Sequence, residues 1–179
     1  VDVDKLARLL EQTAEKGDRI YKWKSSLGQD KGIGYNICLS HGMSSIVSVL
    51  SLLESEGINR ERRDRIIRHT CNYILSQEID HVKYGAFFPS QSLENNPGDD
   101  NHYSRLAWCY GDLGVATSLW QAGKALHNRE WQEKALEVLR FSTSRRDFRN
   151  AGVIDAGLCH GAASVCMMFH YAYRQTGEK

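Results

Sequence analysis

Apolar residues recur along this chain with the period of an α-helix, and two kinds of helical segment alternate. Residues 60–77 carry their apolar side chains on one stripe, and a later segment around Trp131 repeats this pattern. One-sided segments of this kind are typical of helices with one face in solvent. Three other segments are apolar on most sides, as in helices buried all round: residues 46–53, 112–124 and 162–174. The pattern therefore predicts buried inner helices paired with amphipathic outer ones.

The remaining segments do not share this alternation. Residues 1–15 have the spacing of an amphipathic helix, which Gly17 can end. Residues 21–35 are rich in glycine and serine and predict a loop. Residues 84–102 hold both prolines of the chain. A long structureless stretch in a compact domain is usually functional, so we expect this one to lie over a site.

The three buried segments share an entry signature, a ring residue followed by glycine: His41-Gly42, Tyr110-Gly111 and His160-Gly161. A small residue follows three positions after each glycine: Ser45, Gly114 and Ser164. We interpret the signature as an internal repeat of helical hairpins, in which small residues let each inner helix start close to a neighbour or a ligand. The predicted fold is all-α, a partial toroid of stacked hairpins with no sheet beyond short strand pairs. The alternative is a coincidence of tight helix starts.

Length and charge narrow the class of protein. The 179 residues suit a single domain. Lys plus Arg number 23 against 22 Asp plus Glu, so the chain lacks the basic surface that nucleic acid requires. No apolar run approaches the ~20 residues of a membrane span, and the charged opening VDVDKLARLL does not have the pattern of a signal peptide. The five cysteines, an odd number, favour a cytoplasmic protein with reduced thiols over a disulfide framework.

Two cysteines and a histidine stand at equivalent points of the repeated hairpins. Zinc favours thiolate and imidazole ligands, and a catalytic zinc site combines three protein ligands with an open position. Cys109, Cys159 and His160 supply such a set, and Gly161 permits the sharp bend that adjacent ligands need. Each cysteine taken alone could instead be a buried apolar thiol, and His160 alone a hydrogen-bonded residue at a helix start.

Two further residues belong near the same end of the predicted ring. His41 occupies the equivalent point of its hairpin without a cysteine beside it, so its imidazole suits proton transfer near neutral pH. Arg105 stands one helical turn before Cys109, where a guanidinium could hold a developing oxyanion. The structural alternatives are a cap-like role for His41 and an ion-paired surface position for Arg105.

Three segments that contain these residues resemble the motifs of the lanthionine synthetase C family, the cyclases of lanthipeptide biosynthesis and their LanC-like relatives. The matching segments are SHGMSS at residues 40–45, SRLAWCYGDLG at 104–114 and LCHGAAS at 158–164. Their order also matches, and a WCYG segment followed by CHG is specific. The resemblance implies an (α/α)6 toroid with zinc, Zn²⁺, at one end of its inner ring.

The resemblance also implies roles for single residues. The two motif cysteines and the histidine that follows the second are the family's zinc ligands, here Cys109, Cys159 and His160. The histidine of the SHG segment is the catalytic acid–base candidate, here His41. The arginine before the first zinc cysteine and the tyrosine of WCYG also lie near the family's site, and they match Arg105 and Tyr110.

The chain departs from the family in two ways. Serines replace small residues of the motifs at positions 44, 45 and 164, which changes little in size. Family members are about twice as long, and an aspartate near the site in their first half has no counterpart here. We therefore expect residues 1–179 to form a single all-α domain that is a fragment of a larger toroid, with a natural half-sized relative as the alternative. Such a fragment would expose apolar flanks and could self-associate.

The expected function is that of a zinc-dependent cyclase, which adds a cysteine thiol to dehydroalanine or dehydrobutyrine in a precursor peptide. The expected partners are a dehydrated precursor peptide or another thiol substrate, and a dehydratase. Two alternatives remain open: a LanC-like protein that adds glutathione or binds thiols, and a zinc-stabilised helical module without chemistry. A glycan-active toroid would need paired carboxylates, and Asp99, Asp100 and Asp112 form no such pair in the sequence.

Overall fold

The structure is a computed structural model that describes residues 2–27, 33–53, 57–100 and 102–178. Its helices in chain order are α1 (Val3–Thr13), α2 (Met43–Leu52), α3 (Arg60–Leu75), α4 (His81–Tyr84), the 3-10 turn η1 (Leu93–Asn95), α5 (Asp112–Ala125), α6 (Arg129–Ser142) and α7 (Ala162–Thr176). The strands are β1 (Glu15–Gly17), β2 (Ile20–Lys22), β3 (Lys24–Ser25) and β4 (Gly34–Tyr35). They form two antiparallel pairs, β1 with β2 and β3 with β4, so the prediction of short strand pairs is confirmed for the described residues.

The two outer helices are α3 and α6, and each buries one stripe as its sequence pattern predicts. Each begins at an asparagine whose side chain accepts a hydrogen bond from a backbone N–H in the first turn: Asn59 for α3 and Asn128 for α6. Ile66 and Ile74 of α3 and Trp131 of α6 face the core, while the opposite faces are exposed. The outer helices therefore shield the inner ones from solvent on one side.

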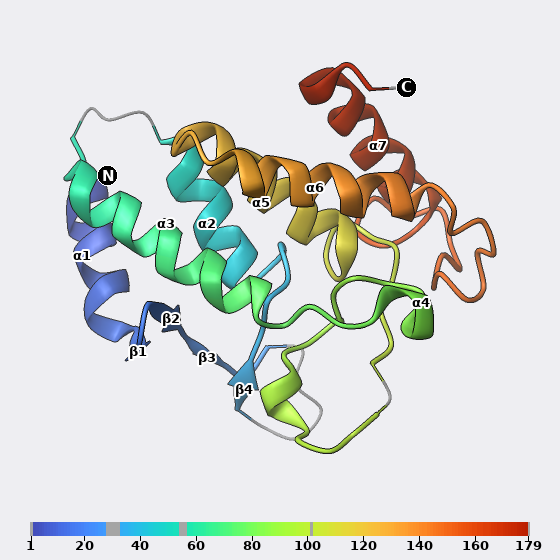
Figure 1. Cartoon of the computed structure of the whole chain (residues 1–179), viewed down its shortest axis with the longest axis horizontal. Helices are drawn as coiled ribbons and strands as arrows, with labels where there is room; N and C mark the ends of the chain where they lie inside the picture. Colours follow the sequence, from blue (N-terminus) through green and yellow to red (C-terminus); the bar gives the residue numbers. More distant parts are fainter. Residues whose placement is uncertain (1, 28–32, 54–56, 101, 179) are drawn as a thin grey trace.

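Helix α5 is the inner helix that its neighbours cover best. It packs along α6 on one side and against α2 on the other, and most of its residues are buried (Figure 1). Helix α2 in turn packs on α3. These contacts make two stacked inner–outer hairpins, α2–α3 and α5–α6, whose inner helices lie side by side. Helix α2 is not buried all round as predicted, because Val49 and Leu52 are exposed.

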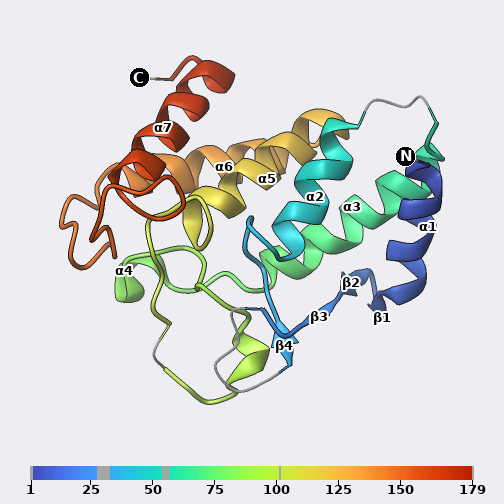
Figure 2. The ribbon, with the colours of Figure 1, turned by 180° about the vertical axis from the view of Figure 1, so that it is seen from behind.

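Helix α7 is not buried all round, contrary to the sequence prediction. Only Ser164 and Met168 of this helix are buried, while Met167 and Tyr173 are 42% and 44% exposed. In Figures 1 and 2 this helix stands away from the rest of the bundle. Few residues of α5 and α6 lie close to it. The described neighbours therefore leave part of the apolar surface of α7 exposed to solvent.

The segments outside the hairpins differ in detail from the sequence predictions. Helix α1 ends at Thr13, and Gly17 lies in β1 rather than ending the helix. The predicted loop at residues 21–35 contains parts of three short strands, while residues 28–32 lie outside the described ranges. At the beginning of the long segment after α4, the backbone N–H groups of Phe87 and Phe88 donate to the buried carboxylate of Asp112, at the start of α5. This segment is not structureless, because it contains η1. No helix within the described ranges is long and apolar enough to cross a membrane.

Candidate metal centre and its neighbours

The starts of the three inner helices meet through backbone hydrogen bonds. The N–H of Leu39, just before α2, donates to the carbonyl of Cys109 at 3.2 Å. The N–H of Cys109, just before α5, donates to the carbonyl of Cys159 at 3.3 Å, just before α7. The Oγ of Ser164 accepts from the N–H of Trp108 at 2.8 Å and donates to the carbonyl of Cys159 at 3.1 Å. The entry signatures predicted from the sequence therefore lie together in the structure.

Glycine is required at these helix starts because other groups occupy the space of a side chain. A Cβ atom at Gly42 would lie 2.5 Å from the carbonyl oxygen of Asn36, and one at Gly161 would lie 2.1 Å from Oδ1 of Asp155. Gly111 also has a φ of +80°, which other residues rarely adopt. The repeated glycines thus let each loop fold tightly against its helix.

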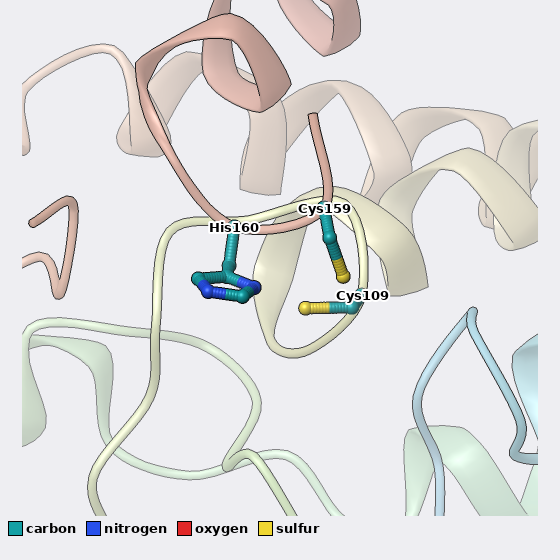
Figure 3. Close-up of side chains that lie close together, drawn as sticks. All are labelled: Cys109, Cys159 and His160. Carbon is teal, nitrogen blue, oxygen red and sulfur yellow. The ribbon is translucent and has the colours of Figure 1, made fainter. Parts of the chain in front are cut away.

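The side chains of Cys109, Cys159 and His160 converge on one place. The two sulfur atoms and one ring nitrogen lie within 4.8 Å of one another (Figure 3). In a tetrahedral zinc site, bonds of ~2.3 Å to sulfur and ~2.0–2.1 Å to nitrogen set ligand atoms roughly 3.5–3.8 Å apart. The chemistry of the three groups suits a zinc ion, and small side-chain rotations would bring the ligand atoms to these distances from one another. Cys109 is buried, whereas Cys159 is exposed, so the cluster opens to solvent on the Cys159 side.

A carboxylate contacts the ring nitrogen of His160 that points away from the sulfurs. Oδ2 of Asp155 lies 3.4 Å from Nε2 of His160, and Figure 3 shows the other ring nitrogen directed at the two cysteines. Histidine ligands of metals usually donate their second ring N–H to a carboxylate, which fixes the ring orientation. Asp155 also accepts from the N–H of Gly157 at 2.7 Å, so the loop itself holds the carboxylate in place.

The electrostatics of the cluster favour a neutral Cys109 thiol when no metal is bound. Burial and the neighbouring Cys159 thiol raise the pKa of Cys109 to about 12, while the charge of Arg105 acts in the opposite direction. A thiol must lose its proton to become a zinc ligand. Metal binding at this cluster would therefore release protons.

His41 lies outside the three-residue cluster and contacts the residue next to it. Nε2 of His41 is 3.0 Å from the hydroxyl of Tyr110, and the two rings pack edge to face with centroids 5.4 Å apart. Burial, the largest influence, raises the pKa of the Tyr110 hydroxyl. The phenol is therefore a neutral donor or acceptor near pH 7. Cys109 and Cys159 both also act on the pKa of Tyr110, so the His41–Tyr110 pair borders the sulfur cluster.

Arg105 influences the cluster through its positive charge. Its side chain runs along Gly152, where a Cβ atom would lie 3.3 Å from the Nε atom of Arg105. Its positive charge lowers the pKa of Cys109 against the larger effect of burial. The structure therefore brings all six predicted residues to one end of the inner helices.

Three contacts in this region involve residues that the sequence analysis did not single out. Asn36 and Cys38 lie against the ring of His41, and Asp155 lies against His160. Their positions just before the SHG and CHG segments are the only signal in the sequence. Asp112, a candidate for paired carboxylate chemistry, is instead fully buried and bonded to backbone N–H groups and to Arg145. It therefore has a structural role at the start of α5.

The fold and the cluster together define a class: a segment of a helical toroid with a thiol–imidazole cluster at the entrances of its inner helices. A sequence model of the family described as "Lanthionine synthetase C-like protein" matches residues 2–179. The chain belongs to this family.

Two comparisons place the chain among individual proteins. Over 141 residues it is 22% identical to "Nisin biosynthesis protein NisC" of Lactococcus lactis subsp. lactis. The matched region covers 75% of this chain and 33% of that protein. Its fold is similar to that of the solved structure of "Nisin cyclase", with a TM-score of 0.68, 20% identity and coverage of 81% of this chain and 36% of that one. The chain thus spans about a third of the length of these proteins, and its helices correspond to part of a toroid.

Proposed function

We propose that this chain is part of a zinc-dependent lanthionine cyclase that adds a cysteine thiol to dehydroalanine or dehydrobutyrine in a precursor peptide. The observation that carries the proposal is the approach of two sulfurs and one imidazole nitrogen to within 4.8 Å of one another. The adjacent contact between His41 and Tyr110, at 3.0 Å, supplies a group for proton transfer beside that cluster. Membership of the LanC-like family supports the same reaction class.

In this proposal Cys109, Cys159 and His160 hold the metal and do not react. Zinc bound there would lower the pKa of the substrate thiol, so that the thiol reacts as thiolate at neutral pH. The sulfur of the peptide cysteine bonds to the β-carbon of the dehydroamino acid, and the electron pair of the double bond passes to the α-carbon and its carbonyl. The proton that the thiol gives up is replaced at the α-carbon, so the atoms balance.

The remaining residues handle charge and the proton. His41, with its Nε2 beside Tyr110, delivers the proton to the α-carbon. Arg105, whose charge already acts on Cys109, holds the developing enolate oxygen. We assign Tyr110 to the same site as the partner that orients His41.

The setting of the reaction follows from the same chemistry. The five cysteines are free, which supports a cytoplasmic protein, where thiols stay reduced. A dehydratase must supply the dehydroamino acid, so we expect one as a functional partner.

We also propose that residues 1–179 act as one all-α domain within a longer toroid. The exposed apolar side chains of Val49, Leu52 and Met167 would cause the isolated chain to self-associate.

One observation favours a second candidate, the addition of a free thiol such as glutathione. Cys159 and Asp155 are exposed, so a small thiol could reach the cluster as easily as a peptide. A zinc-stabilised module without chemistry would have no need of the contact between His41 and Tyr110. The two catalytic candidates share the same residues and differ in the thiol they accept.

The test is an assay of the complete, zinc-loaded protein with a dehydrated peptide that contains one cysteine. Ring closure protects that cysteine from alkylation, so mass spectrometry after alkylation separates cyclised from linear peptide. Addition of glutathione to a cysteine-free dehydrated peptide reports the second candidate through its mass increase. Cyclisation supports the first candidate and adduct formation alone supports the second. Inactivity in both assays with full zinc content would refute both.

A further inference from the structure

Asn36 lies beneath the ring of His41 and is almost completely buried, with 1% of its surface exposed. Its Nδ2 atom is 3.4 Å from Nδ1 of His41 and 3.2 Å from the carbonyl oxygen of Leu27. Its Oδ1 atom accepts from the N–H of Cys38 at 2.9 Å. The side-chain amide thus has a partner at each end and the imidazole beside its nitrogen.

These partners fix which end of the amide faces the histidine. A backbone N–H is only a donor, so Cys38 requires the oxygen of Asn36 on its side. A backbone carbonyl is only an acceptor, so Leu27 requires the nitrogen on the other. Both requirements agree, and a flipped amide would lose both bonds. The group that faces Nδ1 of His41 is therefore an N–H donor.

A donor at Nδ1 determines the tautomer of the neutral ring. Nδ1 must offer its lone pair to the amide of Asn36, so the single ring proton resides on Nε2. Nε2–H can then donate to the hydroxyl oxygen of Tyr110 at 3.0 Å.

One other group stands near Nδ1. The sulfur of Cys38 is 3.8 Å away, but a thiol is a weak hydrogen-bond donor whose hydrogen can rotate. This sulfur also accepts from the N–H of His41 and contacts the hydroxyl of Ser40. Cys38 therefore permits either tautomer, whereas the amide of Asn36 permits one.

We propose that Asn36 is a positioning residue that holds the neutral His41 ring with its proton on Nε2, facing Tyr110. The tautomer follows from the contacts alone. Its consequence for catalysis rests on the proposed function: with Nδ1 engaged by Asn36, Nε2 is the ring nitrogen on the Tyr110 side, and the ring acts as an acid only after it takes up a second proton. A ring turned or re-protonated at Nδ1 would present no Nε2–H to Tyr110.

The first measurement is histidine-selective ¹⁵N NMR of the complete, zinc-loaded protein, above the pH at which its imidazoles are protonated. The His41→Gln variant identifies the His41 signals by their loss. Wild type should show a protonated Nε2 and a bare Nδ1. Asn36→Asp places an acceptor where the amide donor stood, so Nδ1 should become protonated. Cys38→Ala should leave the wild-type pattern unchanged.

The matched control is Asn72→Asp on α3, which makes the same chemical change at a residue that bonds the carbonyl of Arg19 on the outer surface. It should leave the His41 signals and the cyclisation rate as in wild type. Asn36→Asp should retain zinc, because Asn36 is not a ligand. Its cyclisation rate should change, because a carboxylate beside Nδ1 favours the doubly protonated ring, which is the form that acts as an acid.

Three results would overturn the assignment: a protonated Nδ1 in wild type, a bare Nδ1 in Asn36→Asp, or an altered tautomer in Cys38→Ala. If Asn36→Asp fails to fold, as judged by zinc content and circular dichroism, the NMR spectra of wild type and of Cys38→Ala still test the assignment. Failure of the proposed function has a different signature. In that case His41→Gln would cyclise at the wild-type rate while the tautomer of His41 still followed Asn36.

Discussion

The backbone N–H of Cys109 donates to the backbone carbonyl of Cys159 at 3.3 Å. The two candidate ligand loops are therefore joined by main-chain atoms rather than through their sulfurs. A change of either side chain leaves this bond in place. Variants of the thiols can consequently test metal binding with little effect on the arrangement of the loops.

Cys109→Ala and Cys159→Ala should each abolish stoichiometric zinc binding and cyclisation in the complete protein. Each change removes one of only two thiolates from a three-ligand set. The measurements are metal content by mass spectrometry and the alkylation assay for ring closure. The matched control is Cys166→Ala, which removes an exposed thiol from α7 and should retain both properties. Full zinc content in either variant would show that the substituted cysteine is not a zinc ligand.

His41→Asn should keep zinc yet slow cyclisation by about 10²–10⁴-fold, the usual effect of a lost general acid. His41 bonds Tyr110 and lies outside the ligand cluster, so the metal should stay. Bulk water would then protonate the α-carbon, and control of its stereochemistry should weaken. Metal content measured beside turnover decides the role. Loss of zinc would make His41 a ligand or a structural residue, and full zinc with full activity would assign the proton to another group.

Arg105→Lys should keep zinc and give a cyclisation rate between those of wild type and His41→Asn. Lysine preserves the positive charge near Cys109 but loses the forked geometry with which a guanidinium holds an oxyanion. Steady-state kinetics should show the effect mainly in kcat, because the enolate forms only during the reaction. A change confined to KM would instead indicate that Arg105 binds the peptide.

Asp155→Asn should weaken zinc affinity by about 10–100-fold, as loss of a carboxylate behind a histidine ligand commonly does. Asparagine keeps the bond to the N–H of Gly157 through its oxygen but removes the negative charge beside Nε2 of His160. Competition with a chromogenic chelator measures the affinity directly. Asp147→Asn is a suitable control, because Asp147 similarly caps an exposed loop through Asn150 and is not part of the ligand cluster. Equal affinities in wild type and Asp155→Asn would deny Asp155 this role.

The stability of the chain should fall as the pH rises from about 4 to 6 by the contribution of Asp112. Burial raises the pKa of this carboxyl from its ordinary 3.8 to about 6, because the bonds from Phe88 and Arg145 only partly offset desolvation. The folded state therefore holds the proton more tightly than the unfolded state. The resulting stabilisation, on the order of 2–3 kcal/mol, is present below pH ~4 and lost through pH ~6.

Urea denaturation at several pH values measures this contribution when wild type is compared with Asp112→Asn. The variant cannot ionise at this position, so its free energy of unfolding should lack that part of the decline. It should also be less stable overall at pH 7 if Arg145 is left without its partner. Parallel pH profiles for the two proteins would show that Asp112 titrates equally in both states.

The sequence by itself determined the longer helices and which residues are candidates for the reactive groups. The single stripe of α3 and the glycine at each inner-helix start are local patterns, and local periodicity and backbone sterics decide such features before any distant contact forms. The WCYG and CHG segments likewise marked Cys109, Cys159 and His160 as one set.

Only the tertiary structure decided how far each helix is buried and which neighbours tune the site. Helix α7 is at least as rich in apolar residues as α5, yet it is largely exposed, because burial depends on how many elements flank a helix. The contacts of Asn36 with His41 and of Asp155 with His160 arise where loops fold back on themselves. Asparagine and aspartate in loops commonly bond nearby backbone, so their sequence positions do not distinguish them from ordinary turn residues. Hydrogen-bond direction is a property of atoms placed in space, and residue order alone does not contain it.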